Sequence, residues 1–231
     1  MKKIVLLCPF IMLLLVSCYE YDADEFSGKI LPRVTGYSTG VTNDWLYFNL
    51  RTGEMFNATA PNQQIKEGEQ LTRTDWDFAV CGYHFRTNGG TSGPGEGGAC
   101  DLGYANYDKW QTASQIPSDV QFVVDDSIYI TYSQADWYRY LGKHNLNFDE
   151  NPWFDPNSGI RQTRSSGNPL LDKAIALSGP PMEYTPSQHT YCIRTADGKH
   201  YYKLMVVSWY NTNSAIDDSG GQMSYYLDEL K

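Results

Sequence analysis

The sequence lacks the short motifs by which several classes of enzyme and metal site are recognised. It contains no Cys-x-x-Cys and no His-x-x-x-His, so nothing in it supports a zinc site. It also contains no His-Glu-x-x-His motif, which marks a large group of metal-dependent hydrolases. Basic residues are few: 18 lysines and arginines stand against 27 aspartates and glutamates, a net charge of −9. So acidic a chain is a poor partner for nucleic acid and for anionic lipid surfaces.

Long hydrophobic runs are absent except at the N-terminus. Residues 4–16 are apolar apart from Pro9 and follow Lys2 and Lys3. These 13 residues are too few for a membrane-spanning helix, which needs ~20, but they suit the core of a signal peptide. The run ends in Leu15-Val16-Ser17-Cys18, which resembles the lipobox of bacterial lipoproteins. An ordinary secretory signal with a chance cysteine is the alternative, and we expect cleavage before Cys18 and lipid on its thiol.

The segment after Cys18 is acidic and rich in tyrosine. Residues 19–25 read Tyr-Glu-Tyr-Asp-Ala-Asp-Glu, which resembles the export tag of surface lipoproteins in some Gram-negative phyla. We therefore expect an outer-membrane lipoprotein exposed at the cell surface and held by its lipid alone. The expected division is a signal peptide over residues 1–17, a lipidated acidic tether over 18–30 and a single domain over 31–231.

The cysteines of the mature chain leave the disulfide state open. Apart from Cys18 they are Cys81, Cys100 and Cys192, an odd number, so at least one stays a thiol while one disulfide is possible in an oxidising compartment. Cys81 and Cys192 fall in strand-like runs, where a buried cysteine usually serves only in packing.

Most of the chain has the pattern of β-strands. Asp197-Gly198 separates two strand-like runs, and an Asp-Gly pair favours the turn of a hairpin because both positions tolerate positive φ. Heavy Pro and Gly punctuation and the absence of a sustained helical period predict a mainly antiparallel β fold, a sandwich or a curved hand-like sheet. One short helix is expected over residues 170–177. The expected strands are residues 45–50, 76–86, 122–124, 128–132, 190–194, 201–210 and 222–227.

The glycine-rich stretch over residues 89–98 is not a phosphate loop, because no lysine follows the glycines and Glu96 would repel a phosphate. We expect a tight structural loop that uses the freedom of glycine at positive φ. An enzyme is not expected either. The acidic pairs at 125–126, 149–150 and 217–218 could serve as acid and base, but each lies in a turn-like context where Asp bonds its own backbone.

Several stretches together resemble the HmuY family of haem-binding lipoproteins. The most specific block is Asp75-Trp76-Asp77-Phe78-Ala79, followed by the stretch from Arg86 to Gly93 and by Gly97-Gly98-Ala99. Residues 45–50 with 53–54 resemble the first core strand of that family, and residues 193–198 with 202–204 its penultimate hairpin. The resemblance covers about residues 40–227.

This resemblance implies a hand-shaped fold of antiparallel strands. Such a protein binds haem between two loops and passes it to an outer-membrane receptor. In this chain the loops are residues 133–160 and 178–183. The second contains Gly179-Pro180-Pro181-Met182, which resembles the ligand loop of the family, so Met182 is one candidate for an axial ligand of the iron. The first loop departs from the family because it contains no methionine. His144 is its candidate ligand, with Tyr138 and Tyr140 as alternatives that would have to lose a proton.

The first loop is also rich in aromatic side chains, which suit the flat face of a porphyrin. The same rings could instead pack the loop onto the sheet or stack on sugar rings, so a surface lipoprotein that binds carbohydrate is the alternative function. The other histidines, His84, His189 and His200, and the strand residues Met205 and Met223 are expected to be structural. The candidates for stacking on haem are Trp137, Trp153 and Phe154.

Overall fold

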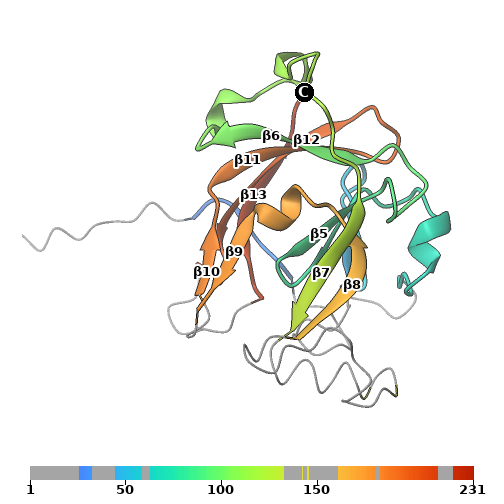
Figure 1. The fold of residues 1–231 in the computed structure, drawn as a ribbon. Coiled ribbons are helices and arrows are strands. Elements are labelled where there is room, and N and C mark those ends of the chain that lie inside the picture. The colour runs from blue at the N-terminus through green and yellow to red at the C-terminus, as the bar shows by residue number, and fades with distance from the viewer. Residues whose placement is uncertain are drawn as a thin grey trace, which may run out of the picture.

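The computed structural model describes residues 26–32, 45–58, 63–132, 161–179, 183–212 and 221–231, together with Gly142 and Asn145. These parts form antiparallel β-sheets and short 3-10 turns, as expected from the sequence (Figure 1). No helix within them is long and apolar enough to cross a membrane. The 3-10 turns are η1 (Glu69–Thr72), η2 (Tyr107–Lys109), η3 (Ala113–Gln115) and η5 (Leu171–Lys173).

The larger sheet has five strands in the order β1-β13-β12-β11-β6. Its β11–β12 hairpin confirms the Asp-Gly turn: Arg194 pairs with Tyr201, and Gly198 has a φ of 71°. The pair β1–β13 lies in part of the expected tether, so the fold begins before residue 31. The strands are β1 (Lys29–Ile30), β6 (Gly98–Tyr104), β11 (His189–Arg194), β12 (Tyr201–Ser208) and β13 (Ser224–Glu229).

The second sheet has four strands in the order β3-β2-β4-β5. The expected strand over residues 76–86 was wrong in one respect, because the run is a hairpin that turns at Gly82, where φ is 59°. The strands are β2 (Leu46–Asn49), β3 (Glu54–Phe56), β4 (Phe78–Cys81) and β5 (His84–Thr87).

Two further pairs of strands form separate ribbons, β7 (Asp126–Tyr132) with β8 (Arg161–Gly167) and β9 (Ile175–Ser178) with β10 (Glu183–Pro186). The helix expected over residues 170–177 was wrong: only η5 is helical, and Ile175 then begins β9. The expected strand at 122–124 is reduced to one bridge, between Val123 and Ala99.

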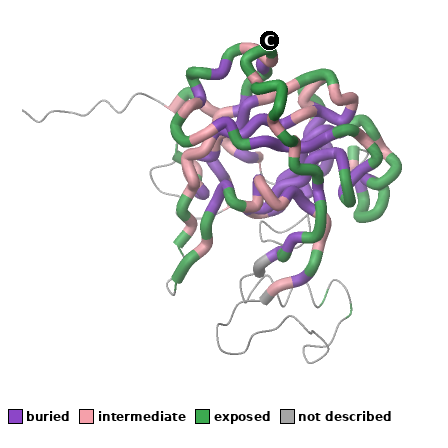
Figure 2. The backbone as a smooth tube through the Cα atoms, turned by 45° about the horizontal axis from the view of Figure 1, so that its top comes forward, coloured by how far each residue is buried: buried purple, intermediate pink, exposed green. Residues whose placement is uncertain are grey.

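Alternating side chains of β2 take part in two different cores. Leu46 and Phe48 pack with strands of both sheets in the main core, whereas Tyr47 packs with β7 side chains such as Ile130 in a second core. The ribbon β7–β8 therefore covers the face of the four-stranded sheet that is turned away from the five-stranded one. Every residue of β2 is buried as a result, and Figure 2 shows the buried backbone gathered in the centre of the domain.

Candidate ligand-binding site

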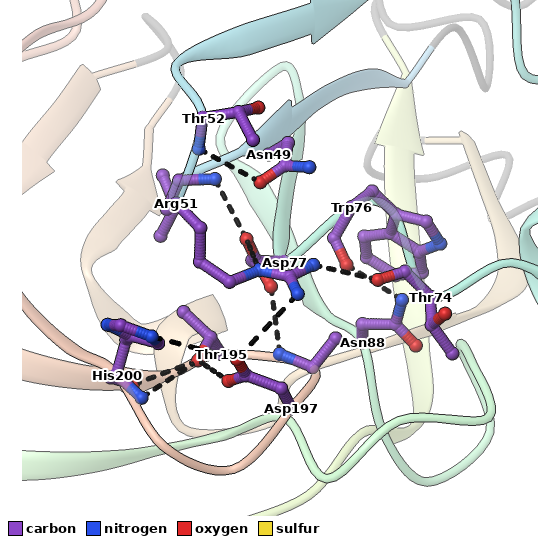
Figure 3. A network of polar contacts seen from close by, with 12 residues as sticks. Asn49, Arg51, Thr52, Thr74, Trp76, Asp77, Asn88, Thr195, Asp197 and His200 are labelled. Carbon is purple, nitrogen blue, oxygen red and sulfur yellow. Dashed lines mark hydrogen bonds and ion pairs between the residues drawn. The ribbon is translucent and has the colours of Figure 1, made fainter.

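The Trp-Asp block at residues 75–79 holds the two sheets together. The carboxylate of Asp77 is fully buried and accepts hydrogen bonds from the backbone N–H of Leu50 at 2.8 Å and of Ala196 at 2.8 Å (Figure 3). Arg51 adds a charged bond from Nε to the same carboxylate at 3.1 Å. Asp77 thus joins the turn after β2 to the turn between β11 and β12, which is a structural role rather than a contact with a ligand.

The glycine-rich loop is structural, as expected, but positive φ explains only part of its composition. Gly90 has a φ of 57°, and a Cβ there would lie 2.1 Å from the carbonyl oxygen of Asp125. A Cβ on Gly89 would lie 2.2 Å from the carbonyl oxygen of Gly97. Most of the glycines are therefore required because backbone segments approach each other closely.

Arg86 fixes the ribbon β7–β8 to the four-stranded sheet. Its guanidinium is buried, lies 3.9 Å from the ring centre of Trp45, and donates to Tyr47 Oη at 2.8 Å. Nε of Arg86 donates to the backbone oxygen of Ser166 at 3.0 Å. Burial raises the pKa of Tyr47 far above its ordinary value, so this hydroxyl stays protonated and accepts the bond from Arg86.

The structure contradicts the role that the sequence predicted for Asp125. It was expected to bond its own turn, but it is buried and accepts bonds from the backbone N–H and the hydroxyl of Thr87, at 2.9 and 2.6 Å. Asn168 donates from Nδ2 to Asp125 at 3.0 Å, and its Oδ1 accepts from the backbone N–H groups of Leu170 and Leu171 where η5 begins. Burial raises the pKa of Asp125 to about 6. Asp126, by contrast, is exposed and bonds the adjacent Ser127 N–H.

The hairpin β4–β5 also reaches the second ribbon, through an aromatic cluster formed by Tyr83, Tyr184 and Trp209. The rings of Tyr184 in β10 and Trp209 after β12 stack with centres 4.8 Å apart, and Tyr83 meets both edge-on at 5.6 Å. Beside this cluster the buried His84 donates from Nδ1 to Asp172 of η5 at 2.5 Å. Sequence reasoning missed the cluster, because its members lie in three segments that are far apart in the chain and meet only in the folded protein.

The two ribbons that border the expected ligand loops extend toward one side of the molecule. Figures 1 and 2 show β7–β8 and β9–β10 extending in the same general direction from the two larger sheets. The loop over residues 133–160 joins β7 to β8, and residues 179–182 join β9 to β10. The hairpin β4–β5 contacts both ribbons, at Ser166 through Arg86 and at Tyr184 through Tyr83. A ligand held by both loops would therefore rest on strands that one hairpin ties together.

The residues proposed to contact that ligand all fall in the loops, outside the described part of the chain, and remain predictions. They are the axial candidates Met182 and His144, the alternatives Tyr138 and Tyr140, and the stacking candidates Trp137, Trp153 and Phe154. Cys18 also lies outside the described residues.

The remaining histidines and methionines agree with a structural role. His189 bonds Asp101 at 2.9 Å, and His200 bonds Glu229 at 3.2 Å. Met223 is fully buried in the main core and Met205 is half-buried in β12. No group of three or more metal-ligating side chains occurs in the part of the chain that the structure describes.

One family model and several solved structures are similar to this chain. A family model described as HmuY protein matches residues 41–226. An apo HmuY analog from Tannerella forsythia has 16% identity, covers 88% of this chain and 95% of its own, and has a TM-score of 0.52. Apo PinO from Porphyromonas gingivitis has 13% identity with the same coverages and TM-score. A candidate HmuY-like haem-binding protein from Bacteroides vulgatus has 19% identity, coverages of 80% and 86%, and a TM-score of 0.49. The structures from Tannerella forsythia and Porphyromonas gingivitis share the fold of this chain. No curated protein matches the chain.

Proposed function

The chain belongs to the HmuY family, whose model spans residues 41–226, and on that premise we propose that it is a cell-surface lipoprotein that binds haem for haem and iron acquisition. The proposal includes delivery of the haem to an outer-membrane receptor. It describes a binding protein, not an enzyme. The observation that carries it is the extent of the match, because residues 41–226 include both ribbons and both loops that would hold the ligand.

The donor groups in the two loops fit haem iron. Met182 offers a thioether and His144 a neutral imidazole, and both are known axial ligands in haem proteins. Met182 follows β9 and His144 follows β7 in the sequence, so the two ligands would come from the loops of two different ribbons. Tyr138 and Tyr140 are the alternatives in the first loop. A thioether ligand raises the reduction potential of haem, so we expect the complex to be tighter with ferrous than with ferric haem.

The described residues would contribute by holding the ribbons in place. Arg86 bonds β8 at Ser166, and Tyr83 packs against Tyr184 of β10, so both ribbons are anchored to the hairpin β4–β5 before any ligand arrives. Fixing them in advance lowers the ordering penalty that binding would otherwise carry. The aromatic residues Trp137, Trp153 and Phe154 of the first loop would then cover the porphyrin face.

The ligand assignment is tested by substitution in the mature protein. Met182→Ala should remove the six-coordinate spectrum of the reduced haem complex and weaken binding several-fold, and His144→Ala should act in the same way. His189→Ala is the matched control, because His189 is bonded to Asp101 on β6 rather than carried by either loop. If both loop variants keep the wild-type spectrum, the assignment is wrong and Tyr138 and Tyr140 become the candidates.

The acquisition role is tested separately from the ligands. Purified mature protein mixed with methaemoglobin should acquire the haem absorption, and the haem-loaded protein should support growth of cells that carry the receptor. Failure of transfer with intact haem binding would remove only the receptor part of the proposal. If haemin does not bind and a glycan array gives a specific signal, the carbohydrate-binding alternative replaces the haem proposal.

A further inference from the structure

Two buried cysteines lie opposite each other on neighbouring strands of the larger sheet. Cys100 of β6 and Cys192 of β11 are direct register partners, and opposed residues of an antiparallel pair point to the same face. Both thiols lie in a small third core under the segment that contains η2 and η3. Its buried members are Cys100, Leu102, Trp110, Cys192 and Leu230.

The backbone spacing at this position is compatible with a disulfide. Ala99, the preceding residue, bonds Val123 through both its N–H and its carbonyl, at 2.9 and 2.7 Å, on the side away from β11. The N–H and carbonyl of Cys100 therefore turn toward β11, which makes Cys100 and Cys192 a hydrogen-bonded pair. Such pairs have Cα atoms about 5.5 Å apart, and disulfides join Cα atoms about 4.4–6.8 Å apart.

The two thiols also differ in chemical character. A hydrogen bond from Cys192 lowers the pKa of Cys100, whereas the contact with Cys100 and burial raise the pKa of Cys192. Cys100 is thus the thiol that ionises more readily and would attack first. Cys81 lies in the second core, among Trp45, Tyr47 and Ile130, which is a different cluster.

We propose that Cys100 and Cys192 form a disulfide when the exported chain meets an oxidising disulfide, while Cys81 remains a thiol. The Cys100 thiolate attacks one sulfur of the external disulfide, which is glutathione disulfide in the test below, and releases one glutathione thiolate. The Cys192 thiolate then attacks the Cys100 sulfur of the mixed disulfide and releases the second glutathione. The protein loses two electrons and two protons, and one glutathione disulfide becomes two glutathione thiols.

The bond would act on the part of the chain that carries the proposed haem site. It closes the segment from residue 100 to residue 192, which contains both ribbons and both loops. Cross-linking the ends of so long a segment restricts the unfolded chain and so favours the folded state. Because both thiols are buried in the completed fold, the exchange belongs to the stage of folding at which β6 and β11 have paired and the two thiols are still accessible.

Peptide mapping tests the bond directly. The full mature chain is refolded with reduced and oxidised glutathione, blocked with N-ethylmaleimide in acidic denaturant, and digested with trypsin. Cleavage after arginine and lysine puts Cys81, Cys100 and Cys192 on separate peptides, residues 74–86, 87–109 and 174–194. The expected result is a linked pair of the second and third peptides, lighter than their sum by two hydrogens, with the label on Cys81 and on neither Cys100 nor Cys192. Label on all three cysteines, or a link that includes Cys81, would overturn the proposal.

Thermal unfolding gives a second readout, which does not depend on the mapping. A phosphine reductant should lower the melting temperature of the oxidised wild type and of Cys81→Ala. It should leave that of Cys100→Ser unchanged. If the reductant has the same effect on Cys100→Ser as on the wild type, the stabilisation does not come from this bond. These measurements use the apo protein, so their outcome is independent of whether haem binds.

Discussion

Replacing Asp77 by alanine should destabilise the fold strongly, although Asp77 contacts no proposed ligand. Its carboxylate is fully buried and is the acceptor for two backbone N–H groups, those of Leu50 and Ala196. Asp77→Ala removes the acceptor but leaves both donors in place. Their positions, after β2 and between β11 and β12, mean that the lost bonds are those that join the two sheets.

The expected magnitude follows from the unmet hydrogen bonds. A buried donor left without a partner costs about 1–3 kcal/mol, so the two N–H groups together cost about 2–6 kcal/mol. Arg51 adds less, because it keeps a bond to the Thr74 carbonyl at 2.8 Å and is partly exposed. Domains of this kind are stable by about 5–15 kcal/mol, so the loss is a large share of the total. Asp77→Asn keeps one acceptor oxygen and should lie between alanine and the wild type.

Urea denaturation followed by circular dichroism measures this loss. Asp75→Ala is the matched control from the same sequence block, because the Asp75 side chain is 50% exposed and pairs with the nearby Arg73. A surface pair of this kind contributes about 0–1 kcal/mol. If Asp77→Ala lowers the free energy of unfolding no more than Asp75→Ala does, the assignment of Asp77 as the link between the sheets is wrong.

Three further predictions concern stability and processing. Burial raises the pKa of Asp125 from 3.8 to about 6, so the folded chain binds the proton of this carboxyl more tightly than the unfolded chain does. Ionised Asp125 therefore lowers the free energy of unfolding, by on the order of 3 kcal/mol above pH ~6, and this loss disappears below pH ~4. The free energy of unfolding should therefore rise as pH falls from 7 to 5, and Asp125→Asn should lack this part of the pH dependence; an identical profile would contradict the burial argument. Trp209→Ala should lower the free energy of unfolding, measured in urea, by about 3–5 kcal/mol because it leaves a cavity in the main core. Tyr210→Ala, at the half-exposed neighbour, should lower it by under about 1 kcal/mol. Equal losses would contradict the packing role of Trp209 in the cluster. Cys18→Ala should abolish fatty-acid labelling in cells, and continued labelling would refute the lipobox assignment.

Local signals in the sequence predicted those parts of the fold that depend on neighbouring residues. The hairpin at Asp197-Gly198 and the strand β2 were predicted correctly, because turn chemistry and strand propensity act over a few residues. The prediction at residues 76–86 failed because Gly82 looked like one glycine within a strand, while its positive φ turns the chain back on itself. The helix at residues 170–177 failed because Ile175 and its neighbours pair with residues 183–186, which a local pattern cannot reveal.

Buried polar contacts between distant segments could not be predicted at all. Asp125 is bonded to Thr87 and Asn168, which lie 38 and 43 positions away, and His84 is bonded to Asp172, 88 positions away. Only the folded sheet brings these partners together. For the candidate site the sequence predicted the strand before the first loop, β7, but it predicted none of β8, β9 and β10, which also border the two loops. The ligands inside these loops stay predictions.

The measurement that tests the central claim most directly is the visible absorption spectrum of the purified mature protein titrated with haemin under reducing conditions. Haem held between the two loops predicts a Soret band typical of six-coordinate iron, which grows to saturation at one haem per chain and is lost in Met182→Ala. A spectrum that stays that of free haem, or a weak change that never saturates, would contradict haem binding by this chain.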